Sequence, residues 1–405
     1  MNKLKLIRKD KRVSALIYLA FFVSFFEPDY VGDCCGGLSG LLLVLKAVYF
    51  IALFALSLKL LIERRNGIPC ILFLAAALHG YLVLVTFAHG GRTLDSIKVF
   101  ATVMAICMMV YVSVETKTFV LMLQAASVYF IVLAALSFIT IMLWPDGLYL
   151  NIEEDVVYYE NNPSAKLNAI RYLCGHKNSI LTTLFPGVIS LGVVAKLRPS
   201  KKASAATVSY LIMLTISTVI VDAVTSAMLC LALLGAFILS NRRSINGRLK
   251  VVVTAAIWLL NIGVSVFRVH YIAAPLFTLL NRNASLSGRT GIWDRALTLI
   301  GDSPLFGYGI PVEEAVKSSF GGFSTAHNML LTMAYYGGLV GLCLYLACFV
   351  SAIKAIDGDS PSGTFVFLSI AGLMAMGMVE SLGMGISFFA FPLAIAFFLH
   401  DGAIG

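Results

Sequence analysis

The residues with the clearest chemical potential are a group of arginines and a histidine in the last third of the chain. Four arginines fall within 28 residues, and His327 follows them: Arg268, Arg282, Arg289 and Arg295. A guanidinium group binds phosphate oxygens through paired hydrogen bonds, so several arginines close together indicate a site for an anion. For any single arginine, a pairing with a nearby acid or a lipid headgroup is the more common explanation.

His327 is a candidate for taking a proton from a substrate hydroxyl. It stands in the segment Ser324-Thr325-Ala326-His327-Asn328, directly before an apolar stretch. Ser324 or Thr325 can cap the helix that this stretch predicts, which places His327 in its first turn. A helix N-terminus favours the neutral imidazole, the form that accepts a proton. A histidine at a membrane interface is more often a hydrogen-bonded anchor than a base, so the residues alone leave both roles open.

The segment between the arginines and the histidine predicts a short helix and a tight turn. Residues 290–300 have helical spacing of their apolar residues, with one face formed by Trp293, Leu297 and Ile300. Ser303-Pro304 ends this helix. The stretch Leu305-Phe306-Gly307-Tyr308-Gly309 then predicts a turn whose glycines allow the backbone to approach a ligand or the membrane surface closely.

These residues belong to a chain whose composition requires a lipid environment. Of its 405 residues, 59% are hydrophobic and only 13% are charged, and the mean hydropathy is +0.91. A soluble fold of this composition would expose a large apolar surface. Apolar stretches of roughly 17 to 25 residues recur along the chain, and each can cross about 30 Å of hydrocarbon as a helix. The sequence therefore predicts an all-α, polytopic transmembrane helix bundle.

We predict twelve spans within a single integral membrane domain, residues 1–405. The spans are residues 13–27, 38–62, 68–88, 97–114, 119–144, 179–196, 204–221, 223–241, 250–267, 327–352, 362–381 and 383–400. Two connections, residues 145–178 and 268–326, are too long to be turns, and loops of this length are usually functional or disordered. The second connection, between spans 9 and 10, carries the four arginines and is predicted to be extracytoplasmic.

Basic residues predict the orientation of these spans. Six of them precede the first span: Lys3, Lys5, Arg8, Lys9, Lys11 and Arg12. Because Lys and Arg concentrate in short cytoplasmic loops, we expect the N-terminus and, after twelve spans, the C-terminus to be cytoplasmic. The net charge of +9 is then mostly a signal of topology, and we do not interpret it as affinity for nucleic acid.

The ordered motifs of the second loop resemble the O-antigen polymerase and O-antigen ligase superfamily. Ser287-Gly288-Arg289-Thr290-Gly291-Ile292-Trp293 is followed by Asp302-Ser303-Pro304-Leu305-Phe306-Gly307-Tyr308-Gly309, and then by His327-Asn328 with Gly338 and Gly341. In that family an arginine precedes a tryptophan, a PLFG-x-G turn follows, and the next helix starts with His-Asn and carries G-x-x-G. A weaker match is Gly175-His176-Lys177-Asn178-Ser179, which resembles the Asn-containing start of a family helix.

The sequence departs from the family pattern at two places. Many members carry a Ser-Arg pair where two adjacent spans meet on the outer side, and here the stretch reads Val224-Thr225-Ser226-Ala227-Met228. A second arginine that holds pyrophosphate is therefore missing there, and its candidate replacements are Arg171, Arg268 and Arg282. The ligase branch tends to continue the glycine motif with threonine, whereas this chain has Leu342, which favours a polymerase.

The resemblance implies a metal-independent glycosyltransferase without a cofactor. Such an enzyme polymerises undecaprenyl-pyrophosphate-linked oligosaccharide repeat units into surface polysaccharide at the outer face of the bacterial cytoplasmic (inner) membrane. The residues implied are His327 for catalysis and, for substrate binding, Arg289, Arg295, Arg282, Arg171, Asn178 and Asn328. The implied partners are the lipid-linked glycan and membrane lipids, with a chain-length regulator and a flippase as further candidates. The residues agree with this, because such a donor needs cations for its diphosphate and a base near the acceptor hydroxyl.

Three other functions are compatible with such a bundle. An O-antigen ligase would transfer the glycan from undecaprenyl pyrophosphate to a lipid-core acceptor. A lipid-linked sugar flippase or transporter usually has internal repeats and ionisable residues at mid-membrane. This sequence shows no repeat, and its candidate polar groups within spans are Lys46, His79 and Asp222. A scaffold of an envelope assembly machine would tolerate any substitution of His327.

Overall fold

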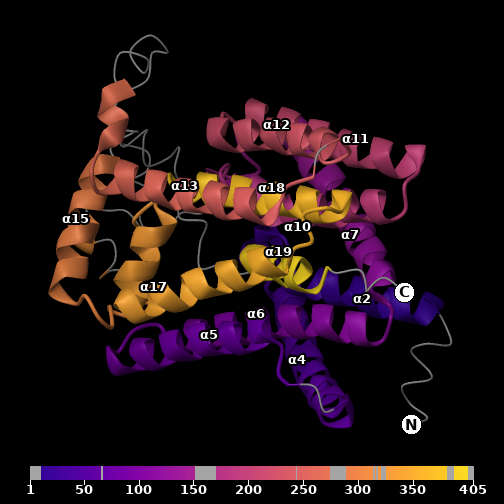
Figure 1. The fold of residues 1–405 in the computed structure, drawn as a ribbon, viewed down its shortest axis with the longest axis horizontal. Helices are drawn as coiled ribbons and strands as arrows, with labels where there is room; N and C mark the ends of the chain where they lie inside the picture. The colour runs from indigo at the N-terminus through magenta and orange to yellow at the C-terminus, as the bar shows by residue number, and fades with distance from the viewer. Residues whose placement is uncertain are drawn as a thin grey trace.

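The chain folds into a bundle of α-helices, so the predicted all-α class is confirmed (Figure 1). The computed structural model describes residues 11–64, 67–150, 170–242, 244–273, 289–312, 315, 318–320, 325–380 and 387–399. Every predicted span coincides with one helix. These helices are α2 (Lys11–Phe25), α4 (Gly36–Arg64), α5 (Cys70–Ala88), α6 (Thr93–Glu115), α7 (Phe119–Leu143), α10 (Ser179–Leu197), α11 (Lys201–Ile220), α12 (Val224–Leu239), α13 (Gly247–Ser265), α17 (Met329–Ala355), α18 (Pro361–Met376) and α19 (Ser387–Phe398).

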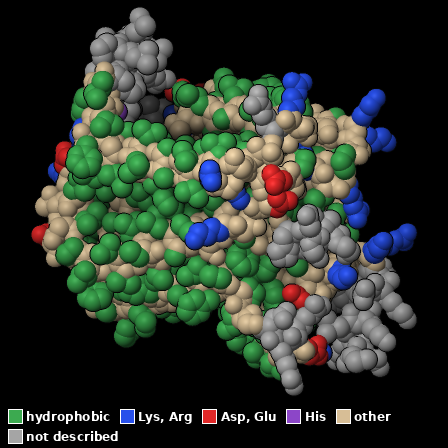
Figure 2. Space-filling view, viewed as in Figure 1, with side chains coloured by type: hydrophobic (Ala, Val, Ile, Leu, Met, Phe, Trp, Pro, Cys, Tyr) green, Lys and Arg blue, Asp and Glu red, His purple; other side chains and the backbone are tan. Residues whose placement is uncertain are grey.

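Eight helices in the described part of the chain are long and apolar enough to cross a membrane. They are α4, α5, α6, α7, α10, α11, α13 and α17. The remaining four, α2, α12, α18 and α19, are shorter, with 15, 16, 16 and 12 residues. Hydrophobic side chains cover much of the face seen in Figure 2, and many Lys and Arg side chains gather at its right edge, where α2 begins in Figure 1. The chain is therefore a multi-pass membrane protein.

Helix α10 lies at the centre of the bundle and contacts α7, α11, α18 and α19. Of its apolar window, 72% is buried, against 17% for α4 and for α13 at the periphery. Glycines allow this close packing: a Cβ at Gly187 would lie 2.3 Å from the Tyr210 hydroxyl, and one at Gly192 would lie 2.0 Å from the Phe365 ring. Because α10 is fixed on all sides, the residues that precede it are held firmly at one end of the bundle.

Helix α17 is interrupted at Gly338, and the turn after α15 (Arg289–Asp302) fills the interruption. Gly338 has φ 59° and ψ −158°, and Figure 1 shows α17 bending. Four backbone hydrogen bonds join the turn to the break: Tyr308 N–H to Tyr335 O, Gly309 N–H to Tyr336 O, Leu339 N–H to Pro304 O, and Val340 N–H to Leu305 O. A Cβ at Gly338 would lie 2.3 Å from the Leu305 carbonyl. The predicted turn is thus confirmed, but the backbone that it approaches closely is that of α17, so it locks α15 to α17.

The loops predicted to be cytoplasmic meet at one end of the bundle. Lys196, at the end of α10, donates to the Phe237 carbonyl and to Asn241 Oδ1, both at 2.6 Å. Lys250, at the start of α13, donates to the Ile353 carbonyl near the end of α17 at 3.4 Å. These contacts place the ends of α10, α12 and α17 beside the start of α13, as the predicted threading requires.

The opposite end contains short elements that the sequence did not predict, and three of them shape the segment before α10. They are the helix α3 (Asp29–Cys34) and the antiparallel strands β1 (Tyr149–Leu150) and β2 (Ile170–Arg171), with Tyr149 opposite Arg171. Tyr30 of α3 donates its backbone N–H to the Leu173 carbonyl at 3.2 Å. These contacts fix the segment that leads from β2 into α10, and this segment carries several of the polar residues described next.

Candidate functional site

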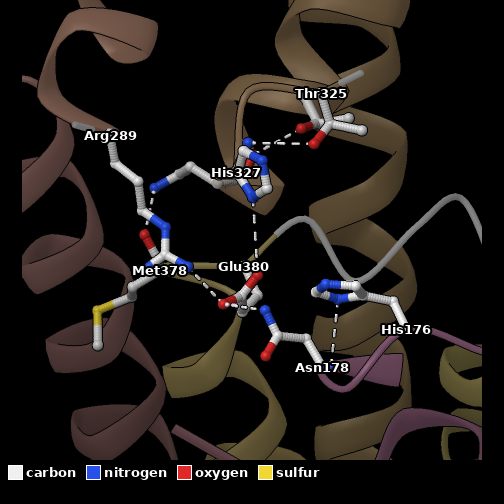
Figure 3. A network of polar contacts seen from close by, with 9 residues as sticks. His176, Asn178, Arg289, Thr325, His327, Met378 and Glu380 are labelled. Atoms are coloured by element: carbon white, nitrogen blue, oxygen red, sulfur yellow. Dashed lines mark hydrogen bonds and ion pairs between the residues drawn. The ribbon is translucent and has the colours of Figure 1, made fainter. Parts of the chain in front are cut away.

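A buried carboxylate, Glu380, joins three polar side chains that come from separate segments of the chain (Figure 3). Arg289 donates to Glu380 Oε1 at 2.5 Å, and Asn178 Nδ2 donates to the same oxygen at 3.3 Å. Nδ1 of His327 lies 3.7 Å from Oε2 of Glu380. The Glu380 side chain is only 9% exposed. The structure thus brings together Arg289, Asn178 and His327, which the sequence analysis selected from three separate motifs.

Arg289 is the first residue of α15, and the buried face of this helix fixes its position. Ile292, Trp293 and Ala296 lie on that face, and Trp293 is fully buried. The predicted helix over residues 290–300 is therefore confirmed, with Trp293 on its apolar face. Because these side chains are anchored in the core, the guanidinium of Arg289 is directed at Glu380 by a rigid helix rather than by a loop.

Arg268 supports α15 from the other side and does not contact Glu380. Its guanidinium carbon lies 5.2 Å from the centre of the Trp293 ring, and its side chain donates to the Thr290 carbonyl at 3.1 Å. It also forms an ion pair with Asp294. Arg268 is thus explained by its pairing with a nearby acid, and its role is to position α15.

His327 does not occupy the first turn of α17, so that prediction is wrong. The helix begins at Met329, and its cap is Asn328, whose Oδ1 accepts the backbone N–H of Leu331 at 3.0 Å. Asn328 is held there by tertiary partners, because its Nδ2 donates to the Met378 carbonyl at 2.9 Å and to Asn261 Oδ1 at 2.7 Å. These contacts decide where the helix starts, and no local pattern encodes them.

The backbone of His327 is in the left-handed region, with φ 46°. This conformation is uncommon for residues other than glycine and costs on the order of 1–3 kcal/mol unless the surroundings enforce it. It reverses the chain just before the Asn328 cap, so that the imidazole points toward Glu380 (Figure 3). Backbone strain of this kind is concentrated at functional sites, which agrees with a chemical role for His327.

Asn178 occupies the cap position of α10, but its side chain makes no cap hydrogen bond. Asn is among the preferred capping residues, so the absence of this hydrogen bond shows that the Asn178 side chain is engaged elsewhere. Its side chain donates to Glu380 instead, and its backbone N–H donates to Nδ1 of His176 at 3.4 Å. The start of α10 therefore supplies one donor to the site and fixes a second histidine beside it.

The pKa of His176 is lowered to about 4, chiefly because the ring is removed from water and further because Arg171 and Lys177 lie nearby. His176 is therefore neutral near pH 7. Since its Nδ1 accepts from Asn178, we assign the proton to Nε2, which makes this ring a hydrogen-bond donor. Arg171, Lys177 and Arg289 bring three cations to this end of the bundle, and each has an acidic neighbour: Asp29, Asp222 and Glu380 respectively.

The other predicted site residues are placed differently. Arg171 lies in β2 and donates to the Ile170 carbonyl at 3.1 Å, close enough to lower the pKa of His176. Arg295 is exposed on α15 and makes no hydrogen bond or ion pair with any described residue. Arg282 lies outside the described residues. Asn328 caps α17 and has no contact with Glu380 among the hydrogen bonds of the described chain.

Lys177 contacts the turn at which the family pattern lacks its second arginine. Its Nζ lies 3.9 Å from Oδ2 of Asp222, in the turn between α11 and α12. Asp222 has φ 53°, and its side chain is 73% exposed. A cation is thus present beside this turn, although it is contributed by the loop before α10.

The sequence analysis did not select Glu380. It is the only Asp, Glu, Lys or Arg between residues 360 and 400. An ionisable residue isolated in such an apolar stretch is a functional candidate on physical grounds, because burying it without a partner is costly. That signal was sufficient to find it, but the partners of Glu380 could not be read from the sequence.

An apolar cavity lies inside the bundle next to this site. It is lined by residues of α5, α6, α17 and α19, including Met329, the first residue of α17. Its volume is about 60 Å³.

The fold and the site define a multi-pass membrane protein with a cluster of charged and polar side chains at one end of its bundle. Residues 203–346 match the family model of the O-antigen ligases, which confirms the resemblance to the O-antigen ligase and polymerase superfamily. The matched region contains Arg289 and His327, while Asn178 and Glu380 lie outside it. No curated protein matches the chain.

Proposed function

We propose that this protein is a membrane glycosyltransferase that polymerises undecaprenyl-pyrophosphate-linked oligosaccharide repeat units into surface polysaccharide. The family match supports a glycosyl-transferring function of the O-antigen ligase and polymerase type. The observation that carries the proposal is the meeting of Arg289, Asn178 and His327 around Glu380 at one end of the bundle. In this proposal Arg289 and Asn178 supply the donors that bind the diphosphate, and His327 is the base.

In the proposed reaction, the acceptor hydroxyl oxygen forms a bond to the anomeric carbon of the donor sugar. The bond between that carbon and the diphosphate oxygen breaks, and undecaprenyl pyrophosphate leaves with the electron pair. Arg289 compensates the charge that develops on the diphosphate. Nδ1 of His327 faces Glu380, so we assign to Nε2 the role of taking the hydroxyl proton. No metal ion is assigned a role in these steps.

The proposed location is the bacterial cytoplasmic membrane, with both termini in the cytoplasm and the site on the outer face. The basic loops gathered around Lys196 and Lys250 support this orientation, because such loops stay in the cytoplasm. Cysteines introduced at Ser318 and Ser200, in a variant without exposed native cysteines, test it. An impermeant maleimide should label Ser318→Cys in intact cells or spheroplasts and leave Ser200→Cys unlabelled, and the reverse pattern would invert the topology.

The second candidate is an O-antigen ligase, which the description of the matching family favours. Leu342, at the place where ligases tend to carry threonine, favours the polymerase. The glycan phenotype of a deletion strain separates the two. Loss of a polymerase leaves single repeat units on the final acceptor, whereas loss of a ligase leaves polymer on undecaprenyl pyrophosphate.

A flippase or transporter finds less support in the polar groups within the helices. Lys46 forms an ion pair with Glu27 at 2.7 Å, and His79 Nδ1 lies 3.0 Å from the Ala75 carbonyl of its own helix. Asp222 is exposed at a helix end and pairs with Lys177. These groups have local partners and do not form a chain across the bundle. Transport would be favoured if purified protein moved lipid-linked sugar across vesicles without extending it.

A further inference from the structure

Glu380 occupies the same groups that the proposed function assigns to the donor diphosphate. Its Oε1 accepts from Arg289 at 2.5 Å and from Asn178 at 3.3 Å. Carboxylate and phosphate oxygens compete for the same guanidinium and amide donors. A diphosphate that enters this site therefore meets both its binding groups and a buried negative charge that already holds them.

We propose that Glu380 is a positioning residue whose carboxylate takes the place of the diphosphate while no donor is bound. When the donor binds, its diphosphate replaces Glu380 as the partner of Arg289 and Asn178. The carboxylate of Glu380 then forms a hydrogen bond with His327. This inference rests on the proposed function, since it takes the donor to be a lipid-linked diphosphate. It adds an order of events, in which binding of the donor prepares the base.

The burial of Glu380 requires a new partner when Arg289 is withdrawn. The side chain is 9% exposed, and a buried carboxylate without a partner is strongly disfavoured. His327 is the described side chain placed to serve, because its Nδ1 lies 3.7 Å from Oε2. This separation exceeds a hydrogen bond by about 1 Å, so a rotation of the carboxylate is enough to close it.

The new pair would favour the chemical step. When a carboxylate accepts a hydrogen bond from Nδ1–H of a histidine, it fixes the tautomer in which Nε2 is free to accept a proton. It also stabilises the imidazolium that forms as Nε2 takes the proton from the acceptor hydroxyl. Glu380 would thus weaken donor binding and accelerate glycosyl transfer. Removing its charge should therefore raise the affinity for the donor and lower kcat.

The test uses full-length protein purified in detergent, with farnesyl pyrophosphate as the binding probe and lipid-linked repeat units as the transfer substrate. Glu380→Gln keeps the shape and removes the charge. We expect the Kd for farnesyl pyrophosphate to fall by about 10-fold or more, because the competing anion is gone. We expect kcat to fall by about 10-fold or more, because His327 loses its anionic partner. Glu63→Gln, an exposed residue paired with Lys59, is the matched control and should change neither value.

Weaker or unchanged binding of the probe by well-folded Glu380→Gln would overturn the proposal, and so would full turnover. If this variant does not remain monodisperse, Glu380→Asp decides, since its shorter side chain loosens the contact with Arg289 and retains the charge. It should bind the probe about twofold to fivefold more tightly than the wild type, and equal or weaker binding would contradict the exchange. In the Arg289→Ala background, Glu380→Gln should no longer tighten binding.

The outcomes separate this inference from the proposed function. If the wild-type protein transfers glycan and Arg289→Ala abolishes binding, the proposed function stands whatever Glu380→Gln does. If the wild type binds no pyrophosphate compound and transfers nothing, the proposed function fails first.

Discussion

Nδ1 of His327 and the guanidinium of Arg289 face the two different oxygens of one carboxylate, that of Glu380. The candidate base and the candidate anion-binding residue are therefore coupled through a single buried side chain. Because substitution of one residue disturbs the partner of the other, each role must be tested with a conservative variant as well as with alanine.

His327→Ala should lower turnover by about 10² to 10⁴-fold, the usual contribution of a general base, while membrane abundance stays close to that of the wild type. His327→Gln separates two roles, since glutamine can hydrogen-bond the acceptor but cannot take its proton. The measurement is kcat of the purified variants with a lipid-linked donor. Near-normal turnover in the glutamine variant would leave orientation of the acceptor as the role, and full activity of the alanine variant would make His327 a structural anchor.

Arg289→Lys should lose most of the activity, on the order of 10-fold or more, because lysine keeps the charge but cannot form the paired hydrogen bonds of a guanidinium. Arg289→Ala should lose more. Arg248→Ala is the control, since Arg248 is exposed at the start of α13, at the end of the bundle predicted to be cytoplasmic, and we expect this variant to retain activity. If all three variants are as active as the wild type at normal abundance, the diphosphate does not bind at Arg289.

Gly338→Ala should sharply lower the membrane abundance and the melting temperature of the protein. A Cβ at this position would lie 2.3 Å from the Leu305 carbonyl, and a φ of 59° costs an alanine on the order of 1–3 kcal/mol by itself. Gly235→Ala in α12 is the control, because nothing lies within 4 Å of its Cβ position. An unchanged melting temperature for Gly338→Ala would show that the turn and the helix break are not rigidly joined.

We expect the lowered pKa of His176 to make the folded protein less stable in mild acid. Its ordinary pKa is about 6.5, whereas burial and the nearby Arg171 and Lys177 lower it to about 4 in the folded protein. Between these pH values the unfolded chain binds a proton that the folded chain does not. The contribution of His176 to the free energy of unfolding is therefore complete above pH 6.5 and declines as the pH falls toward 4.

Asp29 has the opposite effect on stability in acid, because burial raises the pKa of its carboxyl to about 6. The informative measurement is therefore a comparison of the wild type with His176→Gln. The melting temperature at pH 7.5 minus that at pH 4.5 should be smaller for His176→Gln than for the wild type. Equal differences in the two proteins would mean that His176 is already protonated or fully solvated near neutral pH.

The sequence was a good guide wherever the signal is local. Every predicted span contains a helix, because long apolar stretches have few alternatives in a membrane. The spacing of Trp293, Leu297 and Ile300 predicted a helix over residues 290–300, and the structure has one from Arg289 to Asp302. Of the proposed site residues, Arg289, His327 and Asn178 were found from motifs, and the structure places them around one carboxylate.

The parts that could not be predicted depend on contacts between distant segments. The start of α17 is an example: Thr325 and Asn328 are both capping residues by type, and the contacts of Asn328 with Asn261 and Met378 decide between them. Glu380 stands 91 residues from Arg289 and 202 residues from Asn178. No periodic pattern joins such positions, so the sequence indicated that Glu380 was unusual without naming its partners.

The most direct test of the central claim is a transfer assay with the purified protein, an undecaprenyl-pyrophosphate-linked repeat unit and a chelator of divalent metal ions. We expect extended glycan and released undecaprenyl pyrophosphate from the wild type and from Arg248→Ala. We expect a loss of about 10-fold or more from Arg289→Ala and of about 10² to 10⁴-fold from His327→Ala. Extension that stops on chelation, or that proceeds equally well in Arg289→Ala and His327→Ala, would contradict the account.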